Sequence, residues 1–397
     1  MQIGLVGKSN VGKSTFFKAV TLADVEISNR PFVTIKPNSG ICYVKIDCVD
    51  KFFNTQCDPR EGYCEKHKRF VPAEIIDVAG LVPGAHKGLG LGSEFLNDLN
   101  QADVLIHVID VSGSVNSFGE PVEVGSYDPA EDIKFLEIEL DMWYLSILKK
   151  GWEKLARFIK QENKEPHKIL GKQLSGLKVD ENMVKDSIEK LGLSEDTLAW
   201  KEEDLLKISR ELRKKTKPMI VAANKADVKN SESNYNRLVK EFPEYIIFPC
   251  SAEAELALKE ASKKDLIEYV PGESNFEIIS EELSDNQKNA LQFIKKNVLE
   301  KFGTTGIQEI INKAVLEVLG YIAVFPGAAN NLKDKDGNTL PDCFLLKNGT
   351  TALDFAYKIH TDIGKNFIKA IDAKKKIPVS KDHVLKHLDV LEIKTNA

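Results

Sequence analysis

Short apolar runs rich in β-branched residues recur through the first 250 positions of the chain, and each ends at turn-forming or polar residues. Stretches whose apolar residues follow helical spacing separate these runs. This alternation predicts a parallel sheet with helices between its strands, which is an α/β fold of the doubly wound kind. Ligands bind such sheets just beyond the carboxyl ends of the strands. We expect strands within residues 3–6, 73–76, 104–109, 219–222 and 246–248.

A long insertion separates the third of these strands from the fourth. It opens with Asp128 and Pro129, a helix start signal, and continues with apolar residues at helical spacing such as Leu136 and Leu140. Lys- and Glu-rich helical stretches follow to about Lys217, and they are interrupted near Pro166 and Gly176. We therefore predict an inserted α-helical hairpin subdomain over residues 128–217.

The remainder of the chain predicts a connector and a second, smaller domain. Helical spacing over residues 284–318 indicates two connecting helices, and short strands return after Gly320. We expect a small α+β domain over residues 319–397. The sheet domain is then left with residues 1–127 and 218–283.

Length and composition fit a multidomain globular protein. The chain has 397 residues, of which 42% are hydrophobic and 29% are charged. No stretch approaches the roughly 20 uncharged apolar residues that a membrane span needs, so we expect no membrane contact. Because the chain opens directly on a buried-strand pattern, we expect no cleavable signal region and a cytoplasmic location.

The six cysteines are too few for a disulfide scaffold in a chain of this length. Three residues, Cys57, Cys64 and His67, lie close enough in sequence to share a metal ion. Their spacing matches no standard zinc pattern, and only three ligands are evident. Ordinary packing is the favoured interpretation, and metal binding remains open.

Charge is unevenly distributed along the chain, whose net charge is −5. Residues 149–217 contain 18 Lys and Arg against 13 Asp and Glu, and residues 319–397 contain 12 against 9. This asymmetry indicates that the insert and the C-terminal part face a polyanion such as RNA. An excess of solvated lysines would give the same pattern, so both interpretations stay open.

A phosphate-binding loop follows the first strand and precedes a helix, as its mechanism requires. Its glycines allow backbone N–H groups to surround phosphate oxygens, Lys13 neutralises the β- and γ-phosphates, and the Ser14 hydroxyl ligates Mg²⁺. The loop and the start of the helix supply the expected nucleotide-binding residues: Gly7, Lys8, Ser9, Asn10, Val11, Gly12, Lys13, Ser14 and Thr15.

Two further segments complete the expected phosphate and magnesium site. Asp77 follows an apolar strand, where its carboxylate can hold Mg²⁺, and the N–H of Gly80 can meet the γ-phosphate. The second segment lies between the phosphate-binding loop and Asp77. Its Thr34 is the candidate for a second Mg²⁺ and γ-phosphate ligand. An ordinary loop threonine is the alternative.

The segment Asn224-Lys225-Ala226-Asp227, at the end of another strand, predicts which base is bound. The carboxylate of Asp227 can accept hydrogen bonds from N1–H and the 2-amino group of guanine, whereas adenine has no such donors. Sites that depend on such hydrogen bonds can discriminate by about 10⁴ or more. Ser251 and Ala252, one strand later, offer a backbone N–H to guanine O6. GTP is therefore favoured over ATP.

Several segments together resemble the Obg/YchF branch of translation-factor-class GTPases. They are the run around Asp77, the glycine-rich stretch at residues 88–92, and the segment 31–38 that corresponds to switch I. Residues 349–360 are similar to the signature of a TGS domain. The resemblance covers essentially the whole chain and implies a GTPase that switches between GTP and GDP states and contacts ribosomes or RNA.

The resemblance also bears on catalysis. Many YchF proteins carry a variant of the base-recognition segment and use ATP, whereas this chain retains Asn224, Lys225 and Asp227. Position 81 is Leu, where Ras-type enzymes place the glutamine that orients water, so slow hydrolysis is expected. The candidate replacements are His86 and a K⁺ ion held by Asn10. The expected catalytic set is Lys13, Thr34, Gly80 and His86.

Other classes of function remain open at this point. A metabolic ATPase or nucleotide kinase would need an acceptor site and fits the base-recognition segment poorly. A nucleotide-dependent protein scaffold and a YchF-like ATPase are further alternatives. The sequence indicates no oligomeric state.

Overall fold

Two compact units make up the computed structural model, which describes residues 1–22, 38–78, 99–328, 330–334 and 336–396. The first unit comprises residues 1–17 and 75–254, and the second comprises residues 18–74 and 255–397. The units are divided at other residues than the domain boundaries expected at 127 and 217. Those domain boundaries stay a prediction. Within the described ranges, no helix is both long enough and apolar enough to cross a bilayer.

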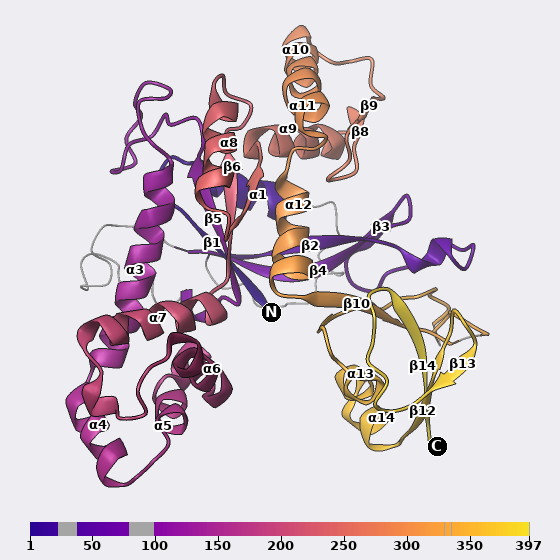
Figure 1. Ribbon diagram of the computed structural model, residues 1–397. Coiled ribbons are helices and arrows are strands. Elements are labelled where there is room, and N and C mark those ends of the chain that lie inside the picture. The colour runs from indigo at the N-terminus through magenta and orange to yellow at the C-terminus, as the bar shows by residue number, and fades with distance from the viewer. Residues whose placement is uncertain (23–37, 79–98, 329, 335, 397) are drawn as a thin grey trace. The chain divides into compact units, whose positions relative to one another are not determined.

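The first unit is built on a parallel sheet whose strands follow the predicted apolar runs (Figure 1). Its strands β1, β5, β6 and β7 are parallel neighbours in that order, and β4 ends on the other side of β1. Every residue of β5 and β6 is buried, which is typical of parallel strands covered on both faces. The strand bounds are β1 Gln2–Val6, β4 Lys68–Asp77, β5 Val104–Asp110, β6 Met219–Asn224 and β7 Ile246–Pro249.

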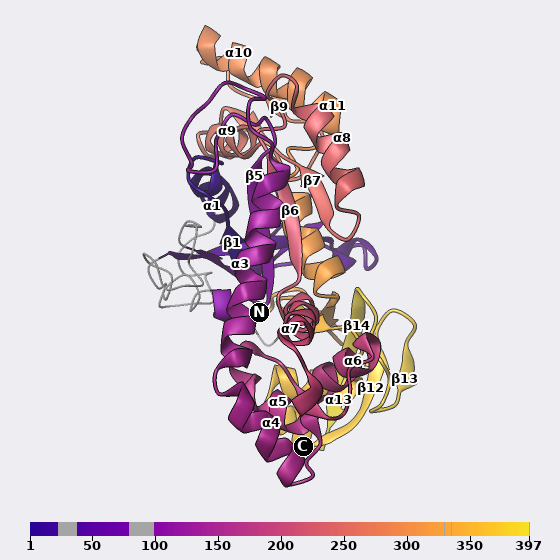
Figure 2. The same cartoon turned by 60° about the vertical axis from the view of Figure 1, so that its left-hand side comes forward.

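Helices follow these strands in the order expected for a doubly wound fold. α1 (Lys13–Thr21) follows β1, α8 (Ser231–Glu241) follows β6, and α9 (Ala252–Lys263) follows β7. α8 packs against β7, and α3 (Ala130–Lys149) packs against β5 (Figures 1 and 2). The predicted α/β class is confirmed, and the carboxyl ends of the strands lead into the expected motifs.

The insert contains five α-helices rather than a simple hairpin. Two of them, α3 and α7, pack against each other, with Tyr144 Oη and Thr216 Oγ1 hydrogen-bonded at 2.7 Å. The predicted apolar stripe lies in this core. Three shorter helices lie between them because Gly151, Pro166 and Gly192 start or end helices. The further helices are α4 Trp152–Gln161, α5 Pro166–Gln173, α6 Glu181–Leu191 and α7 Glu202–Thr216.

The second unit contains the end of α1, the strands β2 and β3 and part of β4, and it continues into the connector. β3 (Tyr63–Glu65) pairs antiparallel with β4, and β2 (Ser39–Asp47) belongs to the same sheet. The connecting helices are α10 (Asp285–Ile294), α11 (Glu300–Phe302) and α12 (Ile307–Asn312). A capping box starts α10: Ser284 Oγ accepts from the Gln287 N–H, and the Gln287 side chain accepts from the Ser284 N–H.

The C-terminal part of the second unit forms its own small sheet with the strand order β11-β10-β14-β12-β13. The helix α13 (Ala352–Ile359) supplies Phe355 to its core, where that side chain is fully buried. The short strands predicted after Gly320 are confirmed, and the first two are β10 and β11. The elements are β10 Tyr321–Pro326, β11 Phe344–Lys347, β12 Phe367–Asp372, β13 Ile377–Val379, β14 Asp389–Thr395 and the short helix α14 Thr361–Lys365. Outside this sheet, β8 (Ile267–Glu268) pairs with β9 (Glu277–Ile278).

Candidate nucleotide-binding site

The loop between β1 and α1 has a backbone that only glycine allows at one position. Gly12 has φ of +91°, and a Cβ atom there would lie 2.3 Å from Nδ2 of Asn224. A side chain would therefore be strained by its backbone angle and would also collide. Close approach of Gly12 to Asn224 joins the phosphate-binding loop to the base-recognition segment within the first unit.

Lys13 and Asp77 form an ion pair through Lys13 Nζ and Asp77 Oδ1. Lys13 is the first residue of α1, and Asp77 is the last residue of β4. The neighbouring Ser14 hydroxyl and the Asp77 carboxylate are hard oxygen donors of the kind that Mg²⁺ prefers. The donor set therefore fits a magnesium-bound phosphate, whose phosphate oxygens Lys13 would neutralise when the nucleotide is bound.

Asn224 is hydrogen-bonded to both of the other motifs that surround it. Its Nδ2 donates to the Val11 carbonyl at 2.8 Å, and its Oδ1 accepts from the Ala252 N–H at 3.0 Å. The side chain is buried. One amide thus fixes the spacing of the phosphate-binding loop, the base-recognition segment and the Ser251-Ala252 segment.

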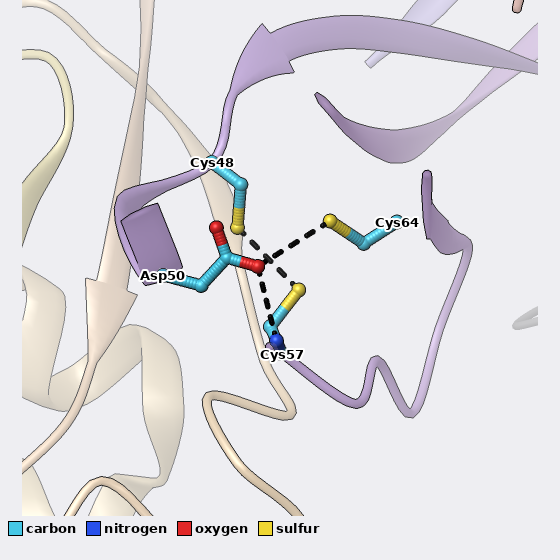
Figure 3. A group of neighbouring side chains, drawn as sticks. All are labelled: Cys48, Asp50, Cys57 and Cys64. Carbon is cyan, nitrogen blue, oxygen red and sulfur yellow. Dashed lines mark hydrogen bonds between the residues drawn. The ribbon is translucent and has the colours of Figure 1, made fainter. Parts of the chain in front are cut away.

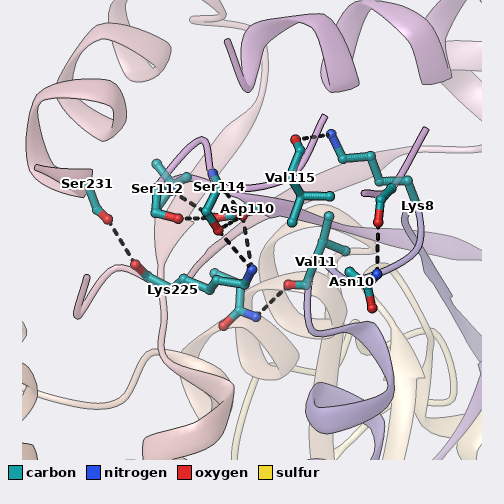
Figure 4. Close-up of polar contacts among 12 residues, drawn as sticks. Lys8, Asn10, Val11, Asp110, Ser112, Ser114, Val115, Lys225 and Ser231 are labelled. Carbon is teal, nitrogen blue, oxygen red and sulfur yellow. Dashed lines mark hydrogen bonds and ion pairs between the residues drawn. The ribbon is translucent and has the colours of Figure 1, made fainter. Parts of the chain in front are cut away.

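Lys225 extends from the same segment to a buried carboxylate (Figure 4). Its Nζ lies 3.0 Å from Asp110 Oδ2 and 3.3 Å from Ser114 Oγ. Burial alone would raise the pKa of Asp110, but hydrogen bonds from Ser112, Ser114 and Lys225 outweigh it and hold the pKa below its usual value. Asp110 therefore carries a negative charge that orients Lys225.

The loop after β5, residues 111–127, contacts the phosphate-binding loop at two points. Lys8 Nζ donates to the Val115 carbonyl at 2.9 Å and also pairs with Asp132 of α3 at 2.9 Å. Asn10 Nδ2 donates to the Gly119 carbonyl at 2.8 Å. The side chain of Lys8 therefore holds the phosphate-binding loop against the 111–127 loop and α3. Only the backbone N–H of Lys8 remains to contact phosphate.

Sequence reasoning missed Asp110 and the 111–127 loop. Asp110 ends an apolar strand, which is the same signal that identified Asp77, and two serines follow it at positions 112 and 114. Serine hydroxyls next to a strand-end carboxylate are a recognisable charge-stabilising pattern. The contacts to Lys8 and Asn10, however, join residues more than 100 positions apart, and local spacing cannot indicate them.

The base-recognition residues lie at the ends of β6 and β7. Asp227 lies three residues after the end of β6, and the Ala226 N–H donates to the Cys250 carbonyl at 3.1 Å, which joins the two strand ends. Ser251 Oγ accepts from the Ala254 N–H at the start of α9. Since the Ala252 N–H is already donated to Asn224, its predicted contact with guanine O6 stays a prediction.

Three expected site residues, Thr34, Gly80 and His86, lie outside the described residues, as do Leu81 and the rest of the switch I segment. The structure brings together the loop residues, Lys13, Asp77, Asn224 and Lys225. The remaining roles stay predictions.

Comparisons with known protein families agree with this geometry. Residues 2–140 match the family model described as 50S ribosome-binding GTPase, residues 222–328 match the G4 motif-containing domain of Obg-like GTPase YGR210-like proteins, and residues 334–395 match the TGS domain. An uncharacterized GTP-binding protein of Methanocaldococcus jannaschii is 52% identical over 98% of both chains. The chain belongs to the YchF/Obg-like family of GTP-binding proteins.

Two further proteins are similar to the chain over most of its length. The ribosome-binding ATPase YchF of Bacillus subtilis is 28% identical over 92% of this chain and 87% of its own. A crystal structure of a GTP-binding protein from Pyrococcus horikoshii superimposes with a TM-score of 0.79 and 38% identity, covering 100% of both chains. The P-loop fold and the C-terminal TGS domain predicted from the sequence are confirmed.

The family includes proteins named for GTP and proteins named for ATP. Family membership therefore supports a P-loop nucleotide hydrolase without choosing the base. The choice depends on the residues at the ends of β6 and β7.

Proposed function

We propose that the chain is a GTP-selective, Mg²⁺-dependent GTPase with slow turnover that switches between GTP and GDP states. The observation that carries the proposal is the placement of Asn224. Its bonds to Val11 and Ala252 support a guanine-binding segment that ends in Asp227. Adenine would leave the Asp227 carboxylate without its two donors, which costs binding free energy.

Hydrolysis is expected to be slow because position 81 is Leu and orients no attacking water. Lys13 would stabilise charge on the transferred phosphoryl group, and Ser14, Thr34 and Asp77 would hold Mg²⁺. Gly80 would contact the γ-phosphate. His86 and a K⁺ ion at Asn10 are the candidate additional catalytic elements.

A ribosomal partner is the second part of the proposal. The Bacillus subtilis relative is named a ribosome-binding ATPase, and the family model over residues 2–140 is named for 50S ribosome binding. The net positive charge of residues 149–217 and 319–397 fits contact with RNA phosphates. We place this activity in the cytoplasm, where ribosomes are found.

Sedimentation with ribosomes tests the switch. The full chain is mixed with ribosomes in the presence of GDP, of a non-hydrolysable GTP analogue, or of the corresponding ATP analogue. Co-sedimentation that depends on the GTP analogue, at least about tenfold above GDP, is expected. Equal binding in all three states would contradict a nucleotide switch and favour a scaffold whose hydrolysis is incidental.

A further inference from the structure

Three cysteines and an aspartate of the second unit gather where β2 ends (Figure 3). One ligand atom from each lies within 4.8 Å of all the others. Cys48 Sγ and Cys57 Sγ are 3.4 Å apart, and Cys64 Sγ is 3.7 Å from Asp50 Oδ2. We call this group the Cys–Asp cluster: Cys48, Asp50, Cys57 and Cys64.

Two separations within the cluster are close to those of a tetrahedral metal site. A Zn²⁺ ion about 2.3 Å from each sulfur and about 2.1 Å from an oxygen would hold sulfurs about 3.8 Å apart, with sulfur and oxygen about 3.6 Å apart. The observed 3.4 and 3.7 Å differ from these separations by a few tenths of an ångström. The other separations in the cluster are at most 4.8 Å, so the side chains would move closer together as the ion binds.

Burial distinguishes this cluster from an ordinary group of surface side chains. Asp50 is 0% exposed, and Cys48 and Cys57 are also buried. The Cys57 N–H donates to Asp50 Oδ2 at 3.0 Å, and the His67 ring holds the other carboxylate oxygen through Nδ1 at 3.0 Å. A carboxylate taken out of water and aimed at three sulfur atoms is the arrangement that metal ligands adopt.

A buried arginine beside the cluster is a second, independent indication. Arg69 is 1% exposed, and its guanidinium donates to the carbonyls of Leu340 and Pro341 and, at 3.6 Å, to Cys57 Sγ. No carboxylate within the described part of the chain is within ion-pair distance of it, although Arg69 partly offsets the burial that raises the pKa of Glu61. A buried cation requires a nearby anion, and thiolates bound to a metal would supply that charge.

His67 belongs to a strained turn rather than to the set of ligand atoms. Lys66 and His67, which join β3 to β4, have φ of +47° and +61°, a conformation that non-glycine residues adopt at a cost. The turn places His67 Nδ1 against Asp50 Oδ1. The group Cys57, Cys64 and His67 considered from the sequence is thus revised: Cys48 and Asp50 join the cysteines, and His67 orients the carboxylate.

We propose that the Cys–Asp cluster binds one structural Zn²⁺ ion through three thiolates and one carboxylate. Thiolates select Zn²⁺ over Mg²⁺ and Ca²⁺, and four protein ligands close the site against water. Each thiol releases its proton to solvent as its sulfur binds the metal. The ligands come from β3 and from the segment between β2 and β3, so the ion would hold the two ends of that segment together.

The ion would also stabilise a contact with the C-terminal part of the same unit. Between Cys57 and Cys64, the Asp58 N–H donates to the Thr339 carbonyl at 2.8 Å, and the Arg60 N–H donates to the Pro341 carbonyl at 3.0 Å. Arg60 additionally pairs with Asp334 at 2.9 Å. A loop fixed by zinc thus supplies a rigid surface for the segment that precedes β11.

Metal content measured on the full chain tests the proposal. Protein purified in a thiol reductant and dialysed without chelator should contain about one Zn²⁺ per chain by plasma mass spectrometry. Cys57→Ser and Cys64→Ser should lower the content at least tenfold. Cys42→Ser is the matched control, because Cys42 is a buried cysteine of β2 whose Sγ contacts only the Ala73 carbonyl within hydrogen-bond distance among described residues.

Cobalt substitution keeps the test decisive where a cysteine variant fails to fold. The unmodified chain reconstituted with Co²⁺ should show a thiolate-to-cobalt charge-transfer band and the visible bands of tetrahedral cobalt. Asp50→Asn and His67→Gln should weaken Co²⁺ binding about 10–100-fold without removing the charge-transfer band. Less than one zinc per ten chains together with no such band would overturn the proposal, as would a Cys48–Cys57 disulfide in the reduced preparation.

Discussion

Two buried residues of the first unit carry opposite charges beside its apolar sheet. Lys8 and Asp132 are both buried and paired at 2.9 Å. Burial lowers the pKa of Lys8 and raises the pKa of Asp132, although their mutual hydrogen bond opposes both shifts. The pair is therefore a positioning device for the phosphate-binding loop, and its removal would alter loop geometry before it altered chemistry.

His107 predicts acid sensitivity of the same sheet. Burial, together with Lys8, lowers its pKa to about 3, and its Nδ1 has no hydrogen-bond partner among the described residues. The unfolded chain would bind a proton at this residue near pH 6.5 and the folded chain only near 3, so the stabilisation is complete above pH 6.5 and is lost as the pH falls. Between pH 6.5 and 5 the loss should be roughly 1.5 kcal/mol.

Urea unfolding of His107→Leu at both pH values measures this contribution. The variant should lose the extra acid sensitivity, whereas His360→Asn, at an exposed helix cap, should keep it. An unchanged pH dependence in His107→Leu would show that His107 is not the group responsible.

Asn10 predicts a dependence of hydrolysis on the monovalent cation. If its side chain positions K⁺ near the phosphates, that ion adds positive charge where negative charge develops. GTP turnover in K⁺ should exceed turnover in Na⁺ by about tenfold or more, and Asn10→Ala should abolish the difference. Asn236→Ala, at an exposed position of α8, is the control. Identical rates of the unaltered chain in the two salts would end this proposal.

At the scale of elements, the packing of α3 against α7 holds the insert together. Arg213 of α7 is 2% exposed and donates through Nε to Asp141 of α3 at 2.9 Å. Its Nη2 also pairs with Glu137 at 3.3 Å. Asp141 would keep its pair with Arg210 at 3.0 Å, but loss of Arg213 removes the buried cation that the two carboxylates share.

Arg213→Met should therefore lower the free energy of unfolding by about 3 kcal/mol. Arg157→Ala, which breaks an exposed pair with Glu153 on α4, should change it by less than about 0.5 kcal/mol. Urea or thermal unfolding of the full chain gives both values. A similar small effect in both variants would mean that the buried network adds little to stability.

The sequence predicts the elements that are locally coded. The core strands of the first unit are apolar runs, so their existence and order follow from local pattern. The long helix α3 follows from its apolar stripe at Leu136 and Leu140. The interruptions predicted near Pro166 and Gly176 separate α4, α5 and α6, because α5 begins at Pro166 and Gly176 lies between α5 and α6. The exact bounds of these helices were not predicted, because the stretch is polar and rich in Lys and Glu.

In the candidate site, too, the residues of short motifs were predicted, whereas contacts between residues far apart in the sequence were not. Lys13, Asp77 and Asn224 were predicted because each lies in a short motif at a strand end. The bond from Asn10 to Gly119 and the gathering of Cys48 with Cys64 depend on how the chain folds back. The spacing of these residues along the sequence does not predict that they lie close together.

At the scale of the whole molecule, charge is the feature that points to a polyanionic partner. Residues 149–217 and 319–397 are each net positive, while the chain as a whole has a net charge of −5. Binding of RNA through such segments releases counterions and so weakens as salt rises. The TGS-domain lysines can be tested without removing any part of the fold.

The combined variant Lys358→Glu, Lys365→Glu and Lys369→Glu should weaken RNA binding and lower the log–log salt slope by up to about 2. These side chains are exposed. The control changes as many exposed lysines on the connector: Lys288→Glu, Lys295→Glu and Lys296→Glu. Filter binding at several salt concentrations gives the slopes. Equal slopes in both variants would contradict RNA contact through the TGS domain.

The central claim is that Asp227 selects guanine. Asp227→Asn replaces one acceptor oxygen with an NH₂ donor, which faces the 2-amino group of guanine donor to donor. Xanthine carries an oxygen at that position, so the new NH₂ can pair with it while the amide oxygen accepts from N1–H. An unmade hydrogen bond at a buried site costs about 1–3 kcal/mol, so the preference should change measurably.

Competition binding of GTP, XTP and ATP to the unaltered chain and to Asp227→Asn is the most direct measurement, with the exposed Asp382→Asn as control. The account predicts that the unaltered chain and the control prefer GTP over ATP, and that Asp227→Asn prefers XTP over GTP. A variant that still selects GTP, or an unaltered chain that binds ATP as tightly as GTP, would contradict it.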